Sequence, residues 1–452
     1  MTFNEQRIKS IIKEHKLEHR EDVIKFINNN LYNLGLKELS RIAELVNNSR
    51  VDTSAYYTDE SILDEIYRSL PKIDKSIIRI LEPSVGIGNF LQPIIDKYSY
   101  AEKLIIEVND IDDSSIEVLK ALNKYRNIPS NVEILYNSCN FLSPLYYCMG
   151  DSHFDLVVGN PPFGKLTKKN GLSEYSMMFN DDNTKNLSGF FLQKSIEIAD
   201  YVSLVMPKYF LNNPDFSITR ERIGKKKIDK ILDFGEKGFK GVLIETIGIF
   251  IDTNNEPEET ECISLCRNII NKISQKRMMS EEFPYWLLYR NDFFDKIAEK
   301  MTFDVFRVFR DRQVTKSILQ EKGDIWVIKS RNISRDGSGI KSIEGYDSFI
   351  DKSTINNLSV GKYIMRDDVY LSPNMTYYPR VIKKPSGVIV NGSVAILESK
   401  ISQDEITDEH LKFLSSSTFE EFYKIARNYS TRSLNIDSNS VKFFGLYSGN
   451  NF

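Results

Sequence analysis

The sequence of 452 residues has no apolar run of about 18 residues, the length that a membrane-spanning helix requires. Its first residues, MTFNEQRIKSIIKEHK, carry charges of both signs and lack the continuous apolar core of a secretion signal. These two absences argue against a membrane protein and against a secreted one. We therefore expect a cytoplasmic protein.

Cysteine and histidine are scarce, with four residues of each. The cysteines show no spacing with a histidine that would complete a zinc site. They are Cys139, Cys148, Cys262 and Cys266. We expect reduced thiols and no metal site.

The chain also lacks an excess of charge of one sign, since 60 basic residues stand against 63 acidic residues and the formal net charge is -3. Any surface for nucleic acid would therefore have to be a local basic patch. Hydrophobic residues make up 41% and charged residues 27%, which is typical of a globular protein. A chain of this length predicts two or three structural units.

Three patterns follow one another along the chain. Residues 5–48 place apolar side chains at intervals of three and four, so we interpret residues 1–48 as an N-terminal helical segment whose role is packing. Residues 49–270 alternate short apolar runs with amphipathic stretches, which predicts an α/β unit with a mainly parallel sheet. Residues 271–452 are turn-rich, with short strand-like segments and a helical stretch at 410–426, which predicts a mixed α+β domain. The runs that predict buried strands are 77–81, 103–108, 132–135, 155–158, 201–205, 230–234 and 247–251.

A glycine turn follows the first of these strands, in ILEPSVGIGNFL (residues 80–91). An acidic residue and a proline end the strand, and Gly86 and Gly88 precede a helix-like continuation. Glycines at such a turn allow positive φ and let a ligand approach the backbone closely. A GxG sequence alone is equally compatible with a plain tight turn.

The ends of the next two strands favour a ligand at this turn. Asp110 and Asp112 come about twenty residues after the glycines, where a carboxylate can accept from ribose hydroxyls. Asn140 and Phe141 follow the third strand and offer an amide and a ring to a purine. Because the full GxGxxG pattern is missing, these residues predict a small adenosyl cofactor rather than a dinucleotide.

The fourth strand ends in DLVVGNPPFGK (residues 155–165). Two consecutive prolines fix two φ angles and hold Asn160 and the Pro161 carbonyl in extended geometry. This amide and this carbonyl can bind the two hydrogens of an exocyclic amino group, while Phe163 stacks on the ring that bears it. The pattern predicts methyl transfer to the amino nitrogen by positioning, without a general base before attack. A double-proline turn that only caps the strand is the alternative.

With these motifs, residues 50–250 resemble the S-adenosylmethionine-dependent amino-methyltransferases, in particular the γ-type N6-adenine DNA methyltransferases of restriction-modification systems. The order of the motifs carries the resemblance, with the glycine motif first, NPPF next and a long C-terminal region last. The segments VSLVMPKYFLNNPDFSITRERI, ILDFGEKGFKGVLIETIGIFI and LKFLSSSTFEEFYKIARNYSTRSLNIDSNSVKFFGL are similar to later parts of the same group. The resemblance implies a Rossmann-like class I methyltransferase fold in residues 49–270, S-adenosyl-L-methionine as the cofactor, and a target recognition domain in residues 271–452.

The resemblance also implies roles for single residues. The catalytic motif falls on Asn160, Pro161, Pro162 and Phe163. Asn140 stands where the family normally has aspartate, which keeps an acceptor oxygen for the adenine amino group but removes the charge. The residues implied to contact the cofactor are Tyr57, Thr58, Glu82, Pro83, Gly86, Gly88, Phe90, Asp110, Asn140 and Phe141.

Double-stranded DNA is the partner that the resemblance implies, and its target adenine can reach Asn160 and Phe163 only when it is flipped out of the duplex. We expect the polar loop at 164–188 to be mobile without DNA and to order over the flipped base. Base readout is assigned to residues 275–452. Each candidate phosphate contact has the alternative of being a solvated surface charge. The candidates are Lys165, Lys168, Lys169, Lys225, Lys226, Lys227, Arg310, Arg312, Arg331, Arg335, Lys383 and Lys384.

Other functions stay open from the sequence. Methylation of cytosine N4, of an RNA base or of a protein glutamine can also use an Asn-Pro-Pro-aromatic motif, although Phe163 and the motif order favour adenine in DNA. A DNA-binding specificity protein without catalysis is disfavoured by the intact NPPF and both glycines. We expect a monomer, with a separate cognate restriction endonuclease as a further partner.

Overall fold

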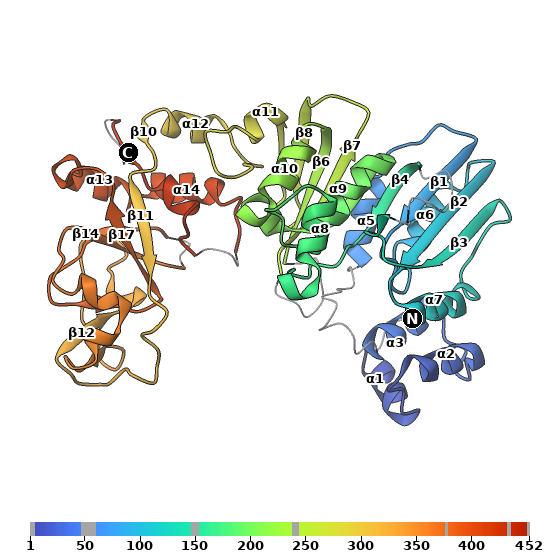
Figure 1. The fold of residues 1–452 in the computed structure, drawn as a ribbon, viewed down its shortest axis with the longest axis horizontal. Coiled ribbons are helices and arrows are strands. Elements are labelled where there is room, and N and C mark those ends of the chain that lie inside the picture. Colours follow the sequence, from blue (N-terminus) through green and yellow to red (C-terminus); the bar gives the residue numbers. More distant parts are fainter. Residues whose placement is uncertain are drawn as a thin grey trace. The chain divides into compact units, whose positions relative to one another are not determined.

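The computed structural model describes residues 5–46, 60–144, 146, 153–236, 244–375, 378–431 and 435–449. The chain divides into two compact units, Met1–Lys276 and Arg277–Phe452 (Figure 1). The boundary that we expected after residue 270 would cut a strand, β9 (Ile269–Ser274), so the division lies later in the chain. Tyr57, Thr58 and Cys148 lie outside the described residues.

A nine-stranded sheet with the order β3-β2-β1-β4-β5-β7-β6-β8-β9 forms the centre of unit 1. The strands β1 to β5 pair in parallel, and β7 runs antiparallel to both β5 and β6. Every strand expected from an apolar run is present, and the central strands β1, β4 and β5 are largely buried on both faces. The additional strands β8 and β9 are more polar. The bounds are β1 (Ile77–Glu82), β2 (Lys103–Asp110), β3 (Val132–Ser138), β4 (Phe154–Gly159), β5 (Ala199–Pro207), β6 (Lys227–Gly235), β7 (Thr246–Asp252) and β8 (Glu259–Ser264).

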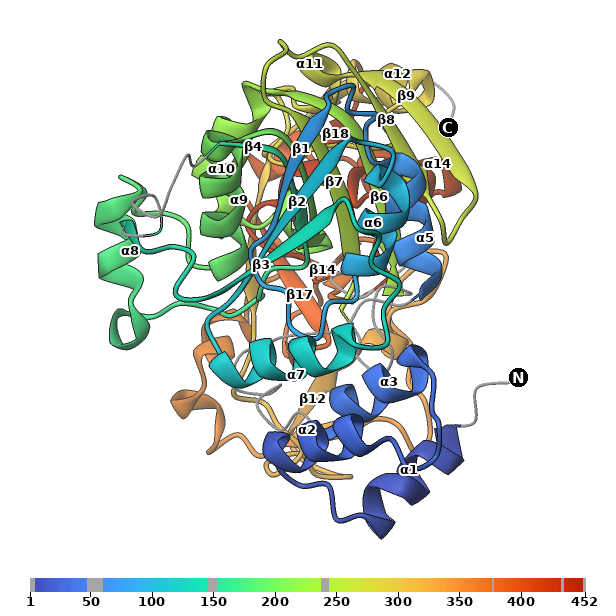
Figure 2. The same cartoon turned by 90° about the vertical axis from the view of Figure 1, so that its right-hand side faces the viewer.

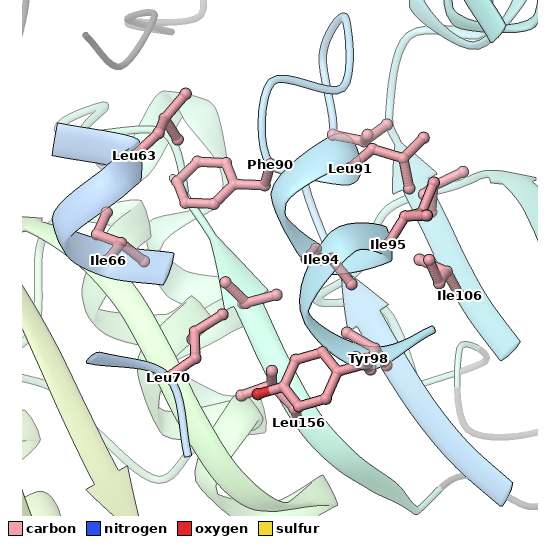
Figure 3. Packing of buried hydrophobic residues seen from close by; sticks show 14 of the residues in the cluster. Leu63, Ile66, Leu70, Phe90, Leu91, Ile94, Ile95, Tyr98, Ile106 and Leu156 are labelled. Atoms are coloured by element: carbon pink, nitrogen blue, oxygen red, sulfur yellow. The ribbon is translucent and has the colours of Figure 1, made fainter. Parts of the chain in front are cut away.

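Helices cover both faces of this sheet. Figure 2 shows α5 (Glu60–Ser69) and α6 (Leu91–Tyr98) on one side, with α9 (Leu187–Ile198) and α10 (Ser217–Gly224) on the other. In the core beneath α5 and α6, Leu63 and Ile66 face the side chains of α6, and Leu156 comes from the central strand β4 (Figure 3). This packing holds α6, and with it the glycine turn that precedes it, in a fixed place against β1.

The described residues 5–46 are helical, as expected, and form α1 (Glu5–Glu14), α2 (Arg20–Asn29) and α3 (Leu36–Val46). They share a hydrophobic core that continues into α7 (Asp113–Asn123), through Val118, Ala121 and Leu122. Figure 2 shows these helices beside α7, the helix that follows β2. The N-terminal segment is therefore packed on the helix next to the predicted ribose-binding end of β2.

Unit 2 is of mixed α and β type, with a four-stranded sheet β11-β17-β14-β15, a three-stranded sheet β13-β12-β16 and a two-stranded pair β10-β18. The helical stretch expected at 410–426 is two helices, because the Ser416 hydroxyl accepts from the Phe419 N–H (3.1 Å) and starts a new helix there. The bounds in and beside this unit are α11 (Gln275–Met278), α12 (Asp292–Ala298), β10 (Met301–Thr302), β11 (Phe306–Arg310), β12 (Ile325–Ile328), β13 (Ser348–Ile350), β14 (Val369–Pro373), β15 (Ile382–Lys383), β16 (Ile389–Val390), β17 (Val394–Ser399), α13 (Asp408–Phe413), α14 (Ser417–Ala426) and β18 (Leu446–Tyr447).

Within the described ranges, no helix has the length and apolar character that crossing a membrane demands. The same residues contain no group of three or more His, Cys, Asp and Glu side chains placed to hold a metal ion.

Candidate functional site

The residues after β1, β2 and β4 meet at one edge of the sheet, because parallel strands bring their carboxyl ends together. The Gly86 N–H donates to Asp110 Oδ2 at 2.9 Å, which joins the turn after β1 to the end of β2. The Ser84 hydroxyl of the same turn donates to the Asn160 carbonyl at 3.1 Å, which joins it to the end of β4. The glycine motif and the NPPF motif thus form one continuous hydrogen-bonded site.

The glycine turn has the backbone conformation that the sequence predicts. Gly86 and Gly88 have φ angles of +55° and +77°, which side chains rarely tolerate. A Cβ atom on Gly88 would lie 2.5 Å from Leu119 Cδ1, whereas the space beside Gly86 is open. At Gly88 only glycine fits without a clash. The open space beside Gly86 leaves the backbone there accessible to a ligand.

Glu82, at the end of β1, is 1% exposed, and its Oε2 atom has no hydrogen-bond partner within the described part of the chain. Burial raises the pKa of Glu82 well above its ordinary value, the charge of Arg126 opposes that rise and the charge of Asp110 adds to it. A buried carboxylate oxygen without a partner, next to an open glycine turn, suits a ligand that brings a positive charge and N–H donors.

Asp110 is fixed in place by two backbone groups. Its carboxylate accepts from the N–H groups of Gly86 (2.9 Å) and Asp112 (3.0 Å). Burial raises the pKa of Asp110, while these two hydrogen bonds lower it. The acid expected to bind a ribose therefore also holds the glycine turn.

Asn109 is a site residue that the sequence reasoning missed. It is 1% exposed, and its amide donates to the Pro83 carbonyl (3.2 Å) and to the Cys139 carbonyl (3.0 Å). One side chain thereby links the ends of β1, β2 and β3. Its only signal in the sequence is a polar residue before Asp110 at the end of an apolar strand.

Asn140 lies at the carboxyl edge, where its amide donates to the Tyr175 hydroxyl at 3.1 Å. Phe141 is 1% exposed and packs against Tyr146 and Phe191, with ring centroids 5.2 and 5.0 Å apart. Phe90 is also buried, and its ring faces Leu63 across the core (Figure 3). Both rings are buried in this structure, and their contact with the cofactor stays a prediction.

Lys194 of α9 holds the loop after β3, a role that no sequence motif indicates. Its side chain is fully buried, and its ammonium donates to the carbonyls of Phe141 and, at 3.0 Å, Ser143. The ammonium also lies 4.9 Å from the centre of the Phe141 ring. Burial lowers the pKa of Lys194 to about 8. The chain segment that follows β3 is therefore held by a buried cation from α9.

The NPPF segment leaves β4, all of whose residues are buried. The Asn160 Oδ1 atom is buried, and Phe163 is 6% exposed. The Phe163 carbonyl accepts from the Asn186 amide at 2.9 Å, and the Gly164 carbonyl accepts from the Leu187 N–H at 2.9 Å. The loop expected at 164–188 contains η2 (Lys168–Asn170) and α8 (Leu172–Met178) and is closed by these contacts. Its mobility stays a prediction.

A buried ion pair lies at the same edge, beyond β5. Lys208 is 4% exposed, and its ammonium lies 2.8 Å from Asp233 Oδ2 and 3.7 Å from Glu245 Oε1. Asp233 comes from β6, and Glu245 lies within the IET segment that precedes β7. These charges join the later motifs of the sequence to the edge that carries NPPF.

The side chains that are candidates for phosphate contacts differ in their exposure to solvent. Lys165, Lys168, Lys169, Arg312, Arg331, Arg335 and Lys383 are exposed, and Arg310 is half-buried. Lys384 is 1% exposed, and its ammonium donates to the carbonyls of Ile364 (3.2 Å), Arg366 (3.0 Å) and Pro385 (2.8 Å). The expectation that Lys384 contacts phosphate is wrong, because its charge is taken up inside unit 2.

Comparisons with known proteins agree with this geometry. Residues 74–239 match the family model described as Eco57I restriction-modification methylase. The chain is 24% identical over 288 residues to the Type II methyltransferase M.VspI of Vibrio sp. (strain 343), and the aligned stretch covers 61% of this chain and 66% of that relative. The chain thus spans slightly less than two thirds of that relative's length.

Solved structures are also similar. One from Listeria monocytogenes, described as a class I S-adenosylmethionine-dependent methyltransferase, has a TM-score of 0.43 at 16% identity and covers 55% of this chain and 84% of that one. The type IIG restriction endonuclease BpuSI has a TM-score of 0.49 at 12% identity and covers 92% of this chain and 61% of that one.

The strand order, the antiparallel β7 and the glycine turn define unit 1 as a class I S-adenosylmethionine-dependent methyltransferase fold, with S-adenosyl-L-methionine as its cofactor. Within that class, residues 74–239 are similar to the Eco57I restriction-modification methylase family.

Proposed function

We propose that this chain transfers a methyl group from S-adenosylmethionine to the N6 amino group of an adenine in double-stranded DNA, as the modification enzyme of a restriction-modification system. The observation that carries the proposal is the position of Asn160, whose carbonyl is joined to the glycine turn by Ser84 (3.1 Å). An amide, two prolines and a phenylalanine beside a cofactor turn suit an amino group on a planar ring.

Glu82, Asp110 and the backbone at Gly86 would hold the cofactor. When bound, the cofactor would supply an electrophilic methyl group, and the new carbon–nitrogen bond would replace the carbon–sulfur bond, whose electron pair would stay on sulfur. Asn160 Oδ1 and the Pro161 carbonyl accept the two amino hydrogens and so orient the nitrogen lone pair. One of these hydrogens leaves as a proton to water after transfer. No residue has to act as a base before attack.

Phe163 is assigned to stack on the target base. Because its ring is 6% exposed here, stacking requires the loop at 164–188 to move, and the Asn186 contact to the Phe163 carbonyl is where that movement would begin. A base within a duplex is stacked and paired, so the adenine has to flip out, at a cost of a few kcal/mol. Contacts from exposed lysines such as Lys165 and Lys168 to phosphates would offset part of this cost.

The remaining parts of the proposal concern partners. Unit 2 would read the DNA sequence, with Arg310, Arg312 and Arg331 among its DNA contacts. The enzyme would act in the cytoplasm as a monomer, alongside a separate restriction endonuclease. The similarity of the chain to a Type II methyltransferase supports the methyltransferase activity on which these partners depend.

The test is transfer of tritiated methyl groups from the cofactor to duplex DNA, RNA and protein substrates. We expect label in DNA, recovered as N6-methyladenine after digestion to nucleosides. Asn160→Ala should abolish labelling while duplex binding is retained, and Asn127→Ala, an exposed asparagine between α7 and β3, is the matched control. Label in N4-methylcytosine, RNA or protein alone would refute the adenine assignment, and unchanged labelling by Asn160→Ala would refute the site.

A further inference from the structure

The four residues of the glycine turn, 86 to 89, are contacted from two sides. On the sheet side, Asp110 accepts from the Gly86 N–H, and Arg126 donates to the Gly88 carbonyl at 3.1 Å. The other two residues of the turn face the N-terminal helices. Ile87 is 5% exposed and belongs to the hydrophobic core of α1, α2 and α3. The N-terminal segment therefore reaches the turn itself.

Asn89 gives the second contact of the turn with these helices. Its amide donates to Glu44 Oε1 of α3 at 3.1 Å. The other oxygen of Glu44 accepts from Arg41 at 2.8 Å, and Arg41 also binds Glu5 of α1 at 2.6 Å. Glu44 is thus held in one orientation by its own helices and presents an acceptor to the turn.

Arg20 of α2 makes a third contact, with the loop after β2 and the start of α7. Its guanidinium lies 2.8 Å from Asp112 Oδ2 and donates to the Ser115 hydroxyl at 2.5 Å. The Asp112 N–H in turn donates to Asp110 Oδ1 at 3.0 Å. Arg20 is therefore connected through one residue to the carboxylate that holds the Gly86 N–H.

The N-terminal helices are anchored firmly enough to transmit these contacts. The Tyr125 hydroxyl donates to the Ile27 carbonyl at 2.7 Å, and the Lys124 ammonium donates to Asn28 Oδ1 at 2.6 Å. Both bonds join α2 to the end of α7. The apolar contact of Val118 and Leu122 with the N-terminal core completes the docking.

We propose that α1, α2 and α3 are a positioning element for the cofactor site, in which Arg20 and Glu44 hold the acid loop and the glycine turn in their binding-competent arrangement. The inference rests on the proposed function only in taking this edge as the place where the cofactor binds. It replaces the interpretation of residues 1–48 as a packing segment. Because coupling is reciprocal, bound cofactor should also stabilise the docked helices.

The test uses the full chain and measures the affinity for S-adenosylhomocysteine by titration calorimetry. Arg20→Met removes the cation and keeps the length of the side chain. Coupling between sites ranges from about 5-fold to 150-fold, and a partly exposed ion pair belongs at the low end, so we expect about fivefold weaker binding. Arg20→Lys should restore most of the affinity. Arg7→Met is the matched control, because Arg7 pairs with Glu38 inside the N-terminal helices (3.9 Å).

Two further measurements separate positioning from a general loss of stability. Turnover at saturating cofactor should stay within about twofold of the wild-type value for Arg20→Met, with the change confined to the KM for cofactor. In wild-type protein, S-adenosylhomocysteine should slow hydrogen exchange in α2 and α3 as well as in the glycine turn. This last measurement needs no variant and so does not depend on whether one folds.

Equal affinity of Arg20→Met and wild type would overturn the inference, as would equal losses in Arg20→Met and Arg7→Met. Unchanged exchange in α2 and α3 on ligand binding would also overturn it. If wild-type protein binds no S-adenosylhomocysteine, the cofactor assignment fails instead. If wild type, Asn160→Ala and Arg20→Met all bind S-adenosylhomocysteine with equal affinity, the cofactor assignment stands. Only the positioning role of the N-terminal helices is then refuted.

Discussion

Replacing Glu82 by glutamine should stabilise the protein without cofactor and weaken cofactor binding at the same time. Glutamine keeps the shape of the side chain and removes its charge. Glu82 is 1% exposed and one of its oxygens has no hydrogen-bond partner in the described structure. An unsatisfied buried polar group costs about 1 to 3 kcal/mol, and more when charged. The charge of Arg126 offsets part of this cost, and the glutamine amide also needs a partner. We therefore expect Glu82→Gln to raise the free energy of unfolding by about 1 to 2 kcal/mol.

The melting temperature reports this gain. For a unit of this size, about 1 to 2 kcal/mol corresponds to a rise of about 2 to 8 °C. The pKa of Glu82 is raised by burial, so the folded state binds more protons than the unfolded state between the ordinary and the raised pKa. Wild-type stability therefore falls as pH rises through that window, and the advantage of Glu82→Gln should be larger at about pH 8 than at about pH 5.

Calorimetry with S-adenosylmethionine supplies the other half of the prediction. Loss of a buried charge-assisted contact should weaken binding by about 1.5 to 3 kcal/mol, which is roughly tenfold to 150-fold. Higher stability together with weaker cofactor binding distinguishes a carboxylate that binds a ligand from one that only stabilises the fold. A variant that melts at a lower temperature and binds the cofactor normally would refute the assignment of Glu82.

Three other variants test the remaining parts of the site. Asn109→Ala removes the donor for two backbone carbonyls and should lower the free energy of unfolding by about 2 kcal/mol, measured by denaturant titration; an unchanged midpoint would contradict the linking role. The pKa of Lys194 is lowered to about 8, so the folded state binds fewer protons than the unfolded state and stability should rise from about pH 8 to about pH 10. Lys194→Met should flatten that rise, and a rise as steep as in wild type would show that another group titrates. Arg331→Ala should weaken binding to all duplexes alike and reduce the slope of log K against log salt by about 1, measured by fluorescence anisotropy, and an unchanged slope would exclude a phosphate contact.

The sequence predicted those parts of the fold whose signal is local. The central strands β1, β4 and β5 are apolar runs because they are largely buried on both faces, and the glycine turn and NPPF are short motifs at the ends of β1 and β4. The signal for helix α3 is also local, because Leu39, Ile42 and Val46 repeat at helical spacing.

The residues that were missed act on partners far away in the sequence. The Asn109 amide binds carbonyls 26 and 30 residues away, and Lys194 binds one 53 residues away. A buried lysine also looks in the sequence like a solvated one, which is why Lys384 was misassigned. The direction of the Phe141 ring depends on Phe191, a contact that no local pattern encodes.

The most direct test of the proposed function is sequencing that detects modified bases in DNA from cells expressing this chain. We predict N6-methyladenine at one recurring sequence motif, and its absence from cells expressing Asn160→Ala. Modified cytosines, or adenines that are unmodified with both proteins although wild type is expressed and folded, would contradict the proposal.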